Sequence, residues 1–392
     1  MKKRVLYYEL VKYLSHKNAL LITGMRQVGK TTLMRQIFEE VKEPKLWFDF
    51  DNPLDQKIFE DEDYKVIYKR LDDMGKKSGK LSVFIDEIQN FPEITKVIKY
   101  LIDHHGVKFY LTGSSSFYLK NLFPESLSGR KFLYELPPLG FSEYLYFKDV
   151  ISLKEVQSLI AYAIKKNSIF THKTRIAEYE DFLTYGGFPE VVTTEDKDTK
   201  IMVLKNIFAS FFEKDIKILS DYSDIRELRD MILLLVPRVG SMLDVTRLSS
   251  ELGIDRVKIY RFLEFLQGTF FIRLLPKFSK SIDRAVAGGK KVYFTDTGLL
   301  NVIGKVGEAQ IFENAVINQL SGFGKVSFLN IRNTAEIDAI LDKDMSFEIK
   351  LTGTQQDLLK LSELSSELEI SQSFLISKRF QNRQGFLSPV IF

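Results

Sequence analysis

The stretch GMRQVGKT, residues 24–31, decides the fold of the first third of this chain. It follows an apolar run at residues 19–22 and opens a helix-prone stretch at residues 31–41. The spacing GxxxxGK[ST] between a strand and a helix is typical of a phosphate-binding loop, because the two glycines let backbone N–H groups point inward at a β-phosphate. The helix that follows adds its positive N-terminal dipole. The sequence therefore predicts a site for a nucleoside triphosphate.

The side chains of this loop predict its cofactors. Lys30 is expected to reach the β- and γ-phosphates and the Thr31 hydroxyl to ligate Mg²⁺, so we expect ATP and Mg²⁺. The alternative is an ordinary glycine turn, which the strand before and the helix after disfavour. The residues predicted to bind the nucleotide are Gly24, Met25, Arg26, Gln27, Val28, Gly29, Lys30, Thr31 and Thr32.

An acidic pair ends the next predicted strand. Residues 81–85 are an apolar run that ends in Asp86 and Glu87, as expected of a central parallel strand buried on both faces. Carboxylates at the carboxyl end of such a strand lie beside the phosphate loop. Asp86 is predicted to hold Mg²⁺ through its water shell, and Glu87 to act as general base for the attacking water. A solvated acidic turn is the alternative.

Polar residues also follow a further strand at residues 107–111. Thr112 or Ser114 could sense the γ-phosphate and orient the water, as in additional-strand P-loop ATPases, although Thr-Gly-Ser is also common loop chemistry. Residues 45–50 indicate another strand. The alternation of helix and strand predicts an α/β fold with a doubly wound parallel sheet.

Arg130 closes the phrase SLSGRK before a short strand at residues 132–136. A guanidinium fixed there could act on the γ-phosphate of its own or a neighbouring subunit, because such arginines stabilise transferred charge. A surface salt bridge is the alternative. A homo-oligomeric ring would allow action between subunits, and a monomer is equally compatible with the sequence.

Composition excludes several classes of protein. The chain has 392 residues, enough for two to four domains, and no cysteine, which rules out disulfides and thiolate metal sites. No stretch approaches the roughly 20 apolar residues that span a bilayer, and the N-terminus lacks the pattern of a secretion signal. We therefore expect no membrane association and a cytoplasmic location. The net charge of +4 requires any nucleic-acid affinity to come from local basic patches.

Residues 244–275 have the pattern of a winged helix-turn-helix. Apolar residues at helical spacing predict two short helices, and Gly253 lies at the turn between them. The second helix carries Arg256, Lys258 and Arg261, which would meet phosphate in a major groove. DNA is therefore an expected partner, and a module for protein contacts is the alternative. The most basic stretch follows, with Lys277, Lys280, Arg284, Lys290 and Lys291.

The last ninety residues hold a second constellation. Glu313 lies in a helical run at residues 311–320, Asp338 in a strand at residues 336–341, and Glu348 and Lys350 on the next strand. Residues two apart on a strand share a face, and a hairpin can bring Asp338 beside Glu348 and Lys350. Two carboxylates can then hold Mg²⁺ while the lysine steadies a hydroxide or the developing charge.

This order and spacing resembles the PD-(D/E)xK nucleases, although Glu336-Ile337 stands where a proline often precedes the aspartate. The resemblance adds Glu313 to the predicted metal ligands Asp338 and Glu348, and makes Glu348 and Lys350 candidates for metal-dependent DNA cleavage. A catalytically inactive platform with the same fold is the alternative.

The motifs together resemble one widespread group of archaeal and bacterial AAA-like ATPases that carry a C-terminal domain of unknown function. The phrases that carry the resemblance are GMRQVGKTTL, FIDEIQNFP, LTGSSS, SLSGRKF, ELPPLGFSEY, YGGFPEVV, KVYFTDTGLLN, EIDAIL and FEIK. The resemblance implies a P-loop ATPase fold and leaves the physiological role open.

Four regions are expected: a P-loop ATPase domain at residues 1–136, a helical lid at 137–220, a winged helix-turn-helix at 221–300, and a restriction-endonuclease-like α/β domain at 301–392. Three functions remain open. The first is an ATPase switch or motor coupled to a DNA-binding, nuclease-like half. The second is a signalling or defence regulator in which ATP gates protein contacts and the C-terminal domain cuts nothing. The third is a nuclease whose ATPase only controls access to the nuclease site.

Overall fold

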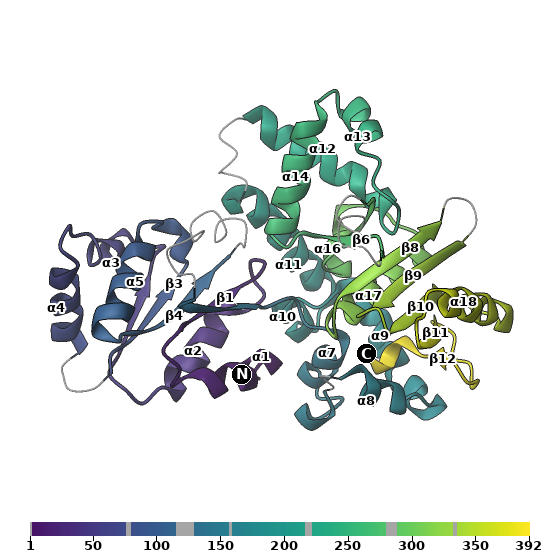
Figure 1. Cartoon of the computed structure of the whole chain (residues 1–392), viewed down its shortest axis with the longest axis horizontal. Coiled ribbons are helices and arrows are strands. Elements are labelled where there is room, and N and C mark those ends of the chain that lie inside the picture. The colour runs from purple at the N-terminus through teal and green to yellow at the C-terminus, as the bar shows by residue number, and fades with distance from the viewer. Residues whose placement is uncertain are drawn as a thin grey trace. The chain divides into compact units, whose positions relative to one another are not determined.

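The computed structural model describes residues 2–75, 80–114, 129–156, 159–215, 222–279, 288–331 and 335–392. Its backbone contacts divide the chain into two compact units (Figure 1). Unit 1 comprises residues 1–137 with 264–270, and unit 2 comprises residues 138–263 with 271–392. The first expected boundary, at residue 136, lies one residue from the first division. The three later regions lie in unit 2 except for residues 137 and 264–270, and their separation into domains stays a prediction.

Unit 1 is built on a five-stranded parallel sheet in the order β2-β3-β4-β1-β5. The strands are β1 (Ala19–Thr23), β2 (Lys45–Asp49), β3 (Ser82–Asp86), β4 (Lys108–Gly113) and β5 (Lys131–Glu135). The three central strands are buried along their whole length, because helices cover both faces of a parallel sheet. The predicted α/β fold with a parallel sheet is confirmed.

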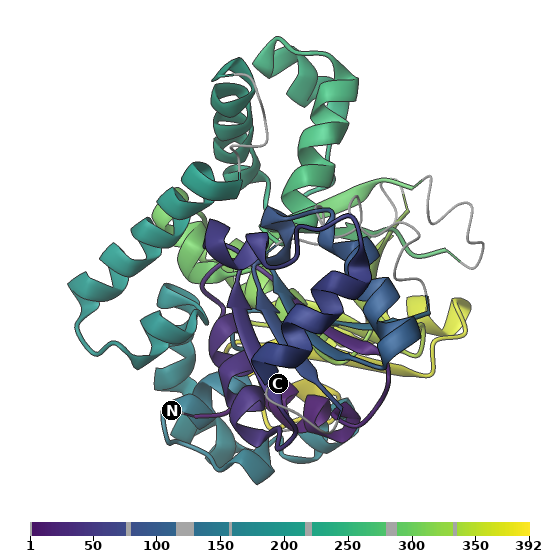
Figure 2. The same ribbon diagram turned by 90° about the vertical axis from the view of Figure 1, so that its left-hand side faces the viewer.

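The helices of unit 1 lie on both sides of this sheet. Figures 1 and 2 show α2 (Lys30–Glu40) on one side, and α4 (Tyr64–Gly75) and α5 (Ile94–His105) on the other. Leu21 of β1 and Leu111 of β4 pack in one core with α4 and α5. The residues next to them along each strand face the opposite side of the sheet. The strand β4 lies between β1 and β3, so the carboxyl ends of all three meet at one edge.

The first half of unit 2 is helical, as the sequence predicts for residues 137–220. The helices are α7 (Phe141–Phe147), α8 (Ile160–Lys165), α9 (Ile169–Tyr185), α10 (Pro189–Thr193) and α11 (Lys197–Ser210). Their role as a lid stays a prediction. Within the described ranges, no helix is long and apolar enough to cross a membrane.

Two helices joined by a turn follow α12 (Tyr222–Leu235). The helix α13 (Val245–Leu252) begins at Asp244, whose side chain accepts from Arg247 N, and ends at Gly253 with φ 68°, the left-handed conformation that glycine adopts at least cost. The helix α14 (Arg256–Gly268) then leads to an antiparallel pair, β6 (Ile272–Pro276) and β7 (Lys290–Phe294). The predicted turn at Gly253 is confirmed.

The chain ends in a five-stranded mixed sheet in the order β12-β11-β10-β9-β8. The strands β8 (Val326–Ile331), β9 (Ala335–Leu341) and β10 (Met345–Lys350) are antiparallel neighbours, and β11 (Gln372–Ser377) and β12 (Phe386–Leu387) continue parallel to β10. The helix α17 (Glu308–Ser321) precedes the sheet, and α18 (Gln355–Glu367) packs on β10 and β11 (Figure 1).

Two of the sequence motifs, YGGFP and FTDTG, pack against each other in unit 2. Asp296 begins α16 (Thr297–Ile303) and accepts from Leu299 N at 2.8 Å and from Gly187 N at 2.7 Å. A Cβ atom on Gly298 would lie 2.1 Å from the carbonyl oxygen of Tyr185, and one on Gly187 would lie 2.1 Å from that of Leu139. These close approaches explain why glycine stands at both positions.

Candidate functional site: a phosphate loop and its acidic partners

The glycines of the loop at residues 24–31 stand where other residues would be strained or would clash. Gly24 has φ 149°, and a Cβ atom there would lie 2.2 Å from the carbonyl oxygen of Leu136. Gly29 has φ 94° and is the residue before α2, and Gln27 between them also has a positive φ of 62°. The chain therefore leaves β1, curls and enters α2 as a phosphate-binding loop does.

Two buried cations hold the shape of this loop. The Nζ atom of Lys30 donates to the carbonyl oxygens of Gly24 at 3.0 Å and Met25 at 2.9 Å. Arg4 donates to the carbonyl oxygens of Val28 at 2.8 Å and Pro137 at 2.9 Å. Sequence reasoning missed Arg4, because nothing in the spacing of the N-terminal segment indicates that it lies beside the loop.

The acidic residues predicted for magnesium and for catalysis lie at the same edge of the sheet as the loop. The Thr112 hydroxyl at the end of β4 donates to Asp86 at the end of β3 and accepts from Glu87 N at 3.2 Å. Asp86 is 4% exposed, and this burial raises the pKa of its carboxyl, while hydrogen bonds from Thr112 and Thr31 act in the opposite direction. Thr31, Asp86 and Thr112 therefore form one connected group.

Gln89 connects Glu87 to Ser114. Its Nε2 atom donates to the Glu87 carboxylate and to Ser114 Oγ, the latter at 2.9 Å. Glu87 itself has φ 53°, a conformation that a non-glycine residue adopts rarely, and such outliers occur at functional sites. Sequence reasoning proposed Ser114 and missed Gln89, although its place three residues after Asp86 was a usable signal. The adjacent Ser115 lies outside the described residues.

Arg130 does not lie near the phosphate loop of its own subunit. It immediately precedes β5, which runs parallel to β1 and pairs Lys131 with Ala19, so Arg130 lies at the amino end of the sheet, opposite the loop. Its Nε atom forms an ion pair with Asp103 of α5 at 2.6 Å. The expectation that it acts within its own subunit is therefore wrong, because parallel strands place their first residues at the far edge. Action on a neighbouring subunit stays a prediction.

The basic residues of α14 differ in their solvent exposure and in their ion pairs. Lys258 forms ion pairs with Asp224, at 2.6 Å, and Glu227, both on α12, and these carboxylates compete with its expected contact with phosphate, which stays a prediction. Arg256 and Arg261 are exposed. Val257 and Tyr260 are 70% and 60% exposed on the same helix. The exposed surface of α14 therefore combines two arginines with two large apolar side chains.

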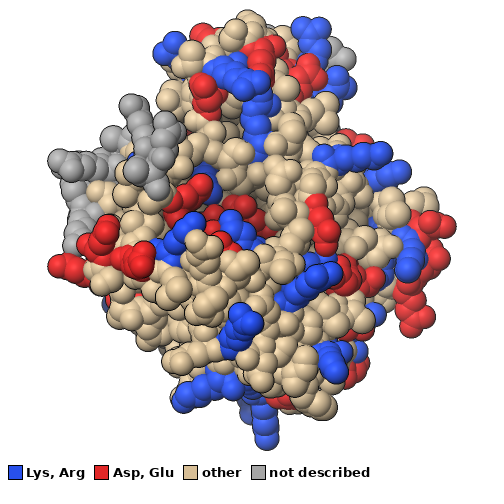
Figure 3. Space-filling view, turned by 90° about the vertical axis from the view of Figure 1, so that its right-hand side faces the viewer, with Lys and Arg blue, Asp and Glu red and all other residues tan. Residues whose placement is uncertain are grey.

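The basic stretch after α14 is also only partly at the surface. Lys290 is exposed, whereas Lys291 is 4% exposed and pairs with acidic residues. Lys280 and Arg284 lie outside the described residues. Figure 3 shows basic and acidic side chains interspersed on the face that includes the C-terminal strands, rather than one continuous basic surface.

The predicted Glu313, Asp338 and Glu348 lie near one another together with Glu336, which was not predicted, and we call these four residues the carboxylate cluster. Asp338 is 9% exposed and accepts from Ile349 N at 2.8 Å. Burial, reinforced by the charge of Asp338, raises the pKa of Glu313 and that of Glu348 to about 7. Burial also raises the pKa of Asp338.

Lysine side chains engage this carboxylate cluster. Lys350 Nζ lies 2.8 Å from Glu348, and Lys291 Nζ lies 2.7 Å from Glu336 and 3.8 Å from Glu313. Among the described residues, no three histidine, aspartate or glutamate side chains are arranged to hold a metal ion. The metal site expected from Glu313, Asp338 and Glu348 is therefore not the arrangement that these side chains adopt, because protein cations and a backbone N–H already contact them.

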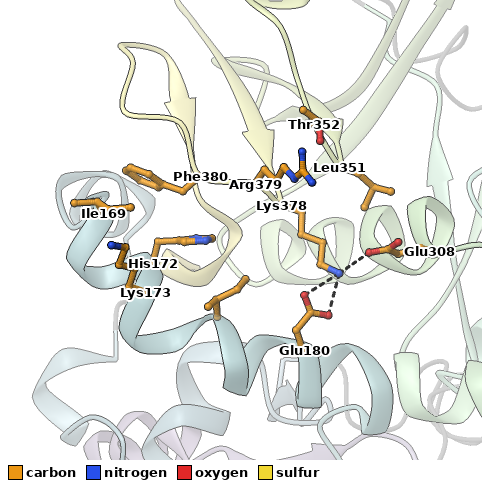
Figure 4. A pocket seen from close by; sticks show the side chains of 11 residues that line it. Ile169, His172, Lys173, Glu180, Glu308, Leu351, Thr352, Lys378, Arg379 and Phe380 are labelled. Carbon is orange, nitrogen blue, oxygen red and sulfur yellow. Dashed lines mark hydrogen bonds and ion pairs between the residues drawn. The ribbon is translucent and has the colours of Figure 1, made fainter.

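Unit 2 also holds a cavity of about 810 Å³ between α9 and the carboxyl ends of β10 and β11 (Figure 4). Lys378 forms ion pairs there with Glu180 at 2.8 Å and Glu308 at 2.7 Å, and its charge is thereby neutralised. Figure 4 shows Lys173 and Arg379 directed apart rather than toward a common point. Sequence reasoning did not indicate this cavity, since its residues come from four separate segments of the chain.

Comparison with known proteins agrees with this geometry. Residues 16–145 match the family model described as an AAA domain, and residues 176–310 match a domain of unknown function. An uncharacterized protein of Methanocaldococcus jannaschii is 26% identical over 371 residues, which cover 89% of this chain and 79% of that protein. An uncharacterized protein of Haemophilus influenzae is 25% identical over 349 residues, covering 86% of this chain and 82% of that protein.

Solved structures give weaker likenesses. A Walker-type ATPase of Pyrococcus abyssi aligns with 16% identity and a TM-score of 0.49, covering 76% of this chain and 94% of that one. The Orc1 protein of Aeropyrum pernix, solved in complex with DNA, aligns with 12% identity and a TM-score of 0.30, covering 76% and 90%. Residues 16–145 thus match an AAA domain and contain the five-stranded parallel sheet of unit 1, and residues 176–310 match a domain of unknown function.

Proposed function

We propose that this chain is a Mg²⁺-dependent ATPase that works as a switch or motor coupled to a DNA-contacting C-terminal half. The observation that carries the ATPase part is the group at one edge of the sheet, in which the Thr112 hydroxyl of β4 donates to Asp86 and accepts from Glu87 N, while Thr31 of the loop lowers the pKa of the same Asp86 carboxyl. Such a group places a hydroxyl and a carboxylate where a P-loop enzyme needs them.

The loop residues divide the work of binding. Backbone N–H groups of residues 24–32 would receive the phosphates, and Lys30 would exchange its bonds to the loop carbonyls for bonds to phosphate oxygens. Thr31 and Asp86 are the residues that would hold Mg²⁺, which supplies charge neutralisation between the β- and γ-phosphates. The influence of Thr31 on the pKa of the Asp86 carboxyl supports this assignment, because it requires the two side chains to lie close together.

Glu87 is the proposed general base. Its backbone N–H is fixed by Thr112 and its carboxylate by Gln89, so both ends of the residue are oriented by neighbours on β4 or next to β3. Ser114 shares Gln89 with it. A base that accepts a proton from water must lie within hydrogen-bond reach of that water, and this arrangement limits where the carboxylate can be.

ATP turnover by the purified chain tests the proposal. Lys30→Ala should abolish turnover, and Glu87→Gln should reduce it by about 100-fold or more while ATP still binds. Glu93→Gln is the matched control, because Glu93 is an exposed carboxylate in the same segment. Unchanged hydrolysis in the Lys30→Ala protein would refute the assignment.

Contact with DNA is proposed for α14 and the strands that follow it, as a winged helix-turn-helix. Support comes from the order α13, α14, β6, β7 and from the exposed Arg256 and Arg261. Duplex DNA that stimulates ATP turnover would favour a motor. The helical region at residues 137–220 is proposed as a lid, and action of Arg130 between subunits requires an oligomer.

A second candidate is a regulator in which ATP gates protein contacts. The exposed Val257 and Tyr260 on α14 favour it, since large apolar side chains at a surface suit a protein partner. A salt titration separates the candidates. DNA affinity that falls steeply with salt supports the first, because phosphate contacts release counterions, whereas no DNA binding even at low salt supports the second.

A further inference from the structure

Two side chains of β7 reach into the carboxylate cluster. Residues two apart on a strand share a face, so Lys291 and Tyr293 point to the same side. Lys291 contacts Glu336 and Glu313, and the Tyr293 hydroxyl donates to Glu313 Oε1 at 2.7 Å. The strand β7, which pairs with β6, therefore contributes two side chains to the carboxylate cluster.

Two carboxylates and an aromatic ring lie near the Lys291 ammonium and stabilise its charge. Lys291 is 4% exposed, its charge is matched by Glu336 and Glu313, and its Nζ atom lies 5.4 Å from the centre of the Phe328 ring. Burying an ammonium ion destabilises the fold unless an acidic group pairs with it. Removing a paired ammonium also destabilises the fold, because its partner carboxylates are then left without a counter-charge.

Glu313 lies beside Gly240, where the absence of a side chain leaves space for the carboxylate. A Cβ atom on Gly240 would lie 3.0 Å from Glu313 Oε1. Tyr293 and Lys291 contact the same oxygen. Glu313 Oε1 is therefore already engaged by a phenol and an ammonium.

We propose that Lys291 is the resident cation of the carboxylate cluster, and that its ammonium supplies there the positive charge that a divalent ion supplies in the nucleases this region resembles. The cluster then fastens the β6–β7 hairpin to the C-terminal sheet instead of holding metal. This inference is independent of ATP hydrolysis, since all its residues lie in unit 2.

Metal uptake by the full chain tests the proposal directly. Mn²⁺ is titrated without nucleotide into the wild type and into Glu313→Gln by calorimetry. The proposal predicts identical titrations, because Glu313 takes part in no metal site. Mn²⁺ uptake that the Glu313→Gln protein loses would overturn the proposal.

Thermal unfolding gives a second, separate test. Lys291→Met keeps the length of the side chain and removes its charge, and it should lower the unfolding midpoint of unit 2 by about 5 °C or more. Lys290→Met is the matched control, because Lys290 is the exposed neighbour on the same strand, and its midpoint should stay that of the wild type. A Lys291→Met protein as stable as the control would overturn the proposal. If that variant does not fold, the Mn²⁺ titrations still decide.

Discussion

A side-chain carbon on Gly24 would lie 2.2 Å from the carbonyl oxygen of Leu136, far inside any normal contact. The two residues are brought together because the segment after β5 hydrogen-bonds to the end of β1, with Leu136 N donating to Thr23 O at 2.7 Å. The first glycine of the loop is therefore fixed by packing as well as by its backbone angle.

Gly24→Ala should weaken ATP binding by about tenfold to 100-fold, because the methyl group must push the loop away from Leu136. Gly29→Ala is the comparison, since no atom lies within 4 Å of its added carbon and only backbone strain acts there. ATP affinity measured by calorimetry should fall more in the first variant. Equal losses of ATP affinity in the two variants would mean that the loop can move away from Leu136 at little cost in free energy.

Thr112→Val should lower kcat by about tenfold to 100-fold with less effect on ATP binding. The change keeps the shape of the side chain and removes the hydroxyl that bonds Asp86 and Glu87 N, and a hydrogen bond to a charged group contributes about 1.5–3 kcal/mol. Thr112→Ser keeps the hydroxyl and should retain most of the activity. A valine variant with wild-type kcat would show that the hydroxyl is dispensable.

Arginine and lysine on α14 should differ in their effect on DNA binding. Arg261→Ala should weaken binding and reduce the salt slope by about 1, as expected for one lost phosphate contact. Lys258→Ala should leave the slope unchanged, because its ammonium is paired with Asp224 and Glu227. Fluorescence anisotropy with a labelled duplex at several salt concentrations measures both. If Lys258→Ala reduced the salt slope of DNA binding and Arg261→Ala did not, the assignment of the phosphate contact to Arg261 would be contradicted.

Asp296 should make stability depend on pH. Burial raises its pKa from 3.8 to about 6. Between these values the folded chain holds a proton that the unfolded chain has released. The stability of the wild type relative to Asp296→Asn should therefore fall as pH rises from about 4 to about 6, by up to about 3 kcal/mol.

Urea unfolding of both proteins across that pH range measures this difference. A constant difference would mean that the N–H groups of Gly187 and Leu299, which donate to the carboxylate, keep its pKa at the ordinary value.

The phosphate loop and its acidic partners could be predicted because their geometry is local. Gly24, Lys30 and Thr31 are fixed by the spacing within one turn, and Asp86 follows from the end of one buried strand. The helices around Gly253 are local in the same sense. The parallel sheet of unit 1 and the position of the loop beside the acidic residues therefore followed from patterns a few residues long.

The errors concern side chains whose partners come from distant segments. Arg130 pairs with Asp103, and Lys291 with α17 and β9. A charge in a sequence indicates that a residue is ionised, and it does not indicate which element will lie opposite it. Basic residues that the sequence assigned to phosphate or to DNA were for this reason partly assigned wrongly.

The pairing of Lys291 with Glu313 and Glu336 limits how the protein can be dissected. A fragment that stops at residue 300 would retain the lysine and lose both carboxylates, leaving an ammonium among apolar neighbours with nothing to compensate it. A fragment that starts there would retain the acids without their cation. Experiments on the second half of the chain should therefore express residues 138–392 as a whole, because a cut at the boundary suggested by sequence separates charges that fold together.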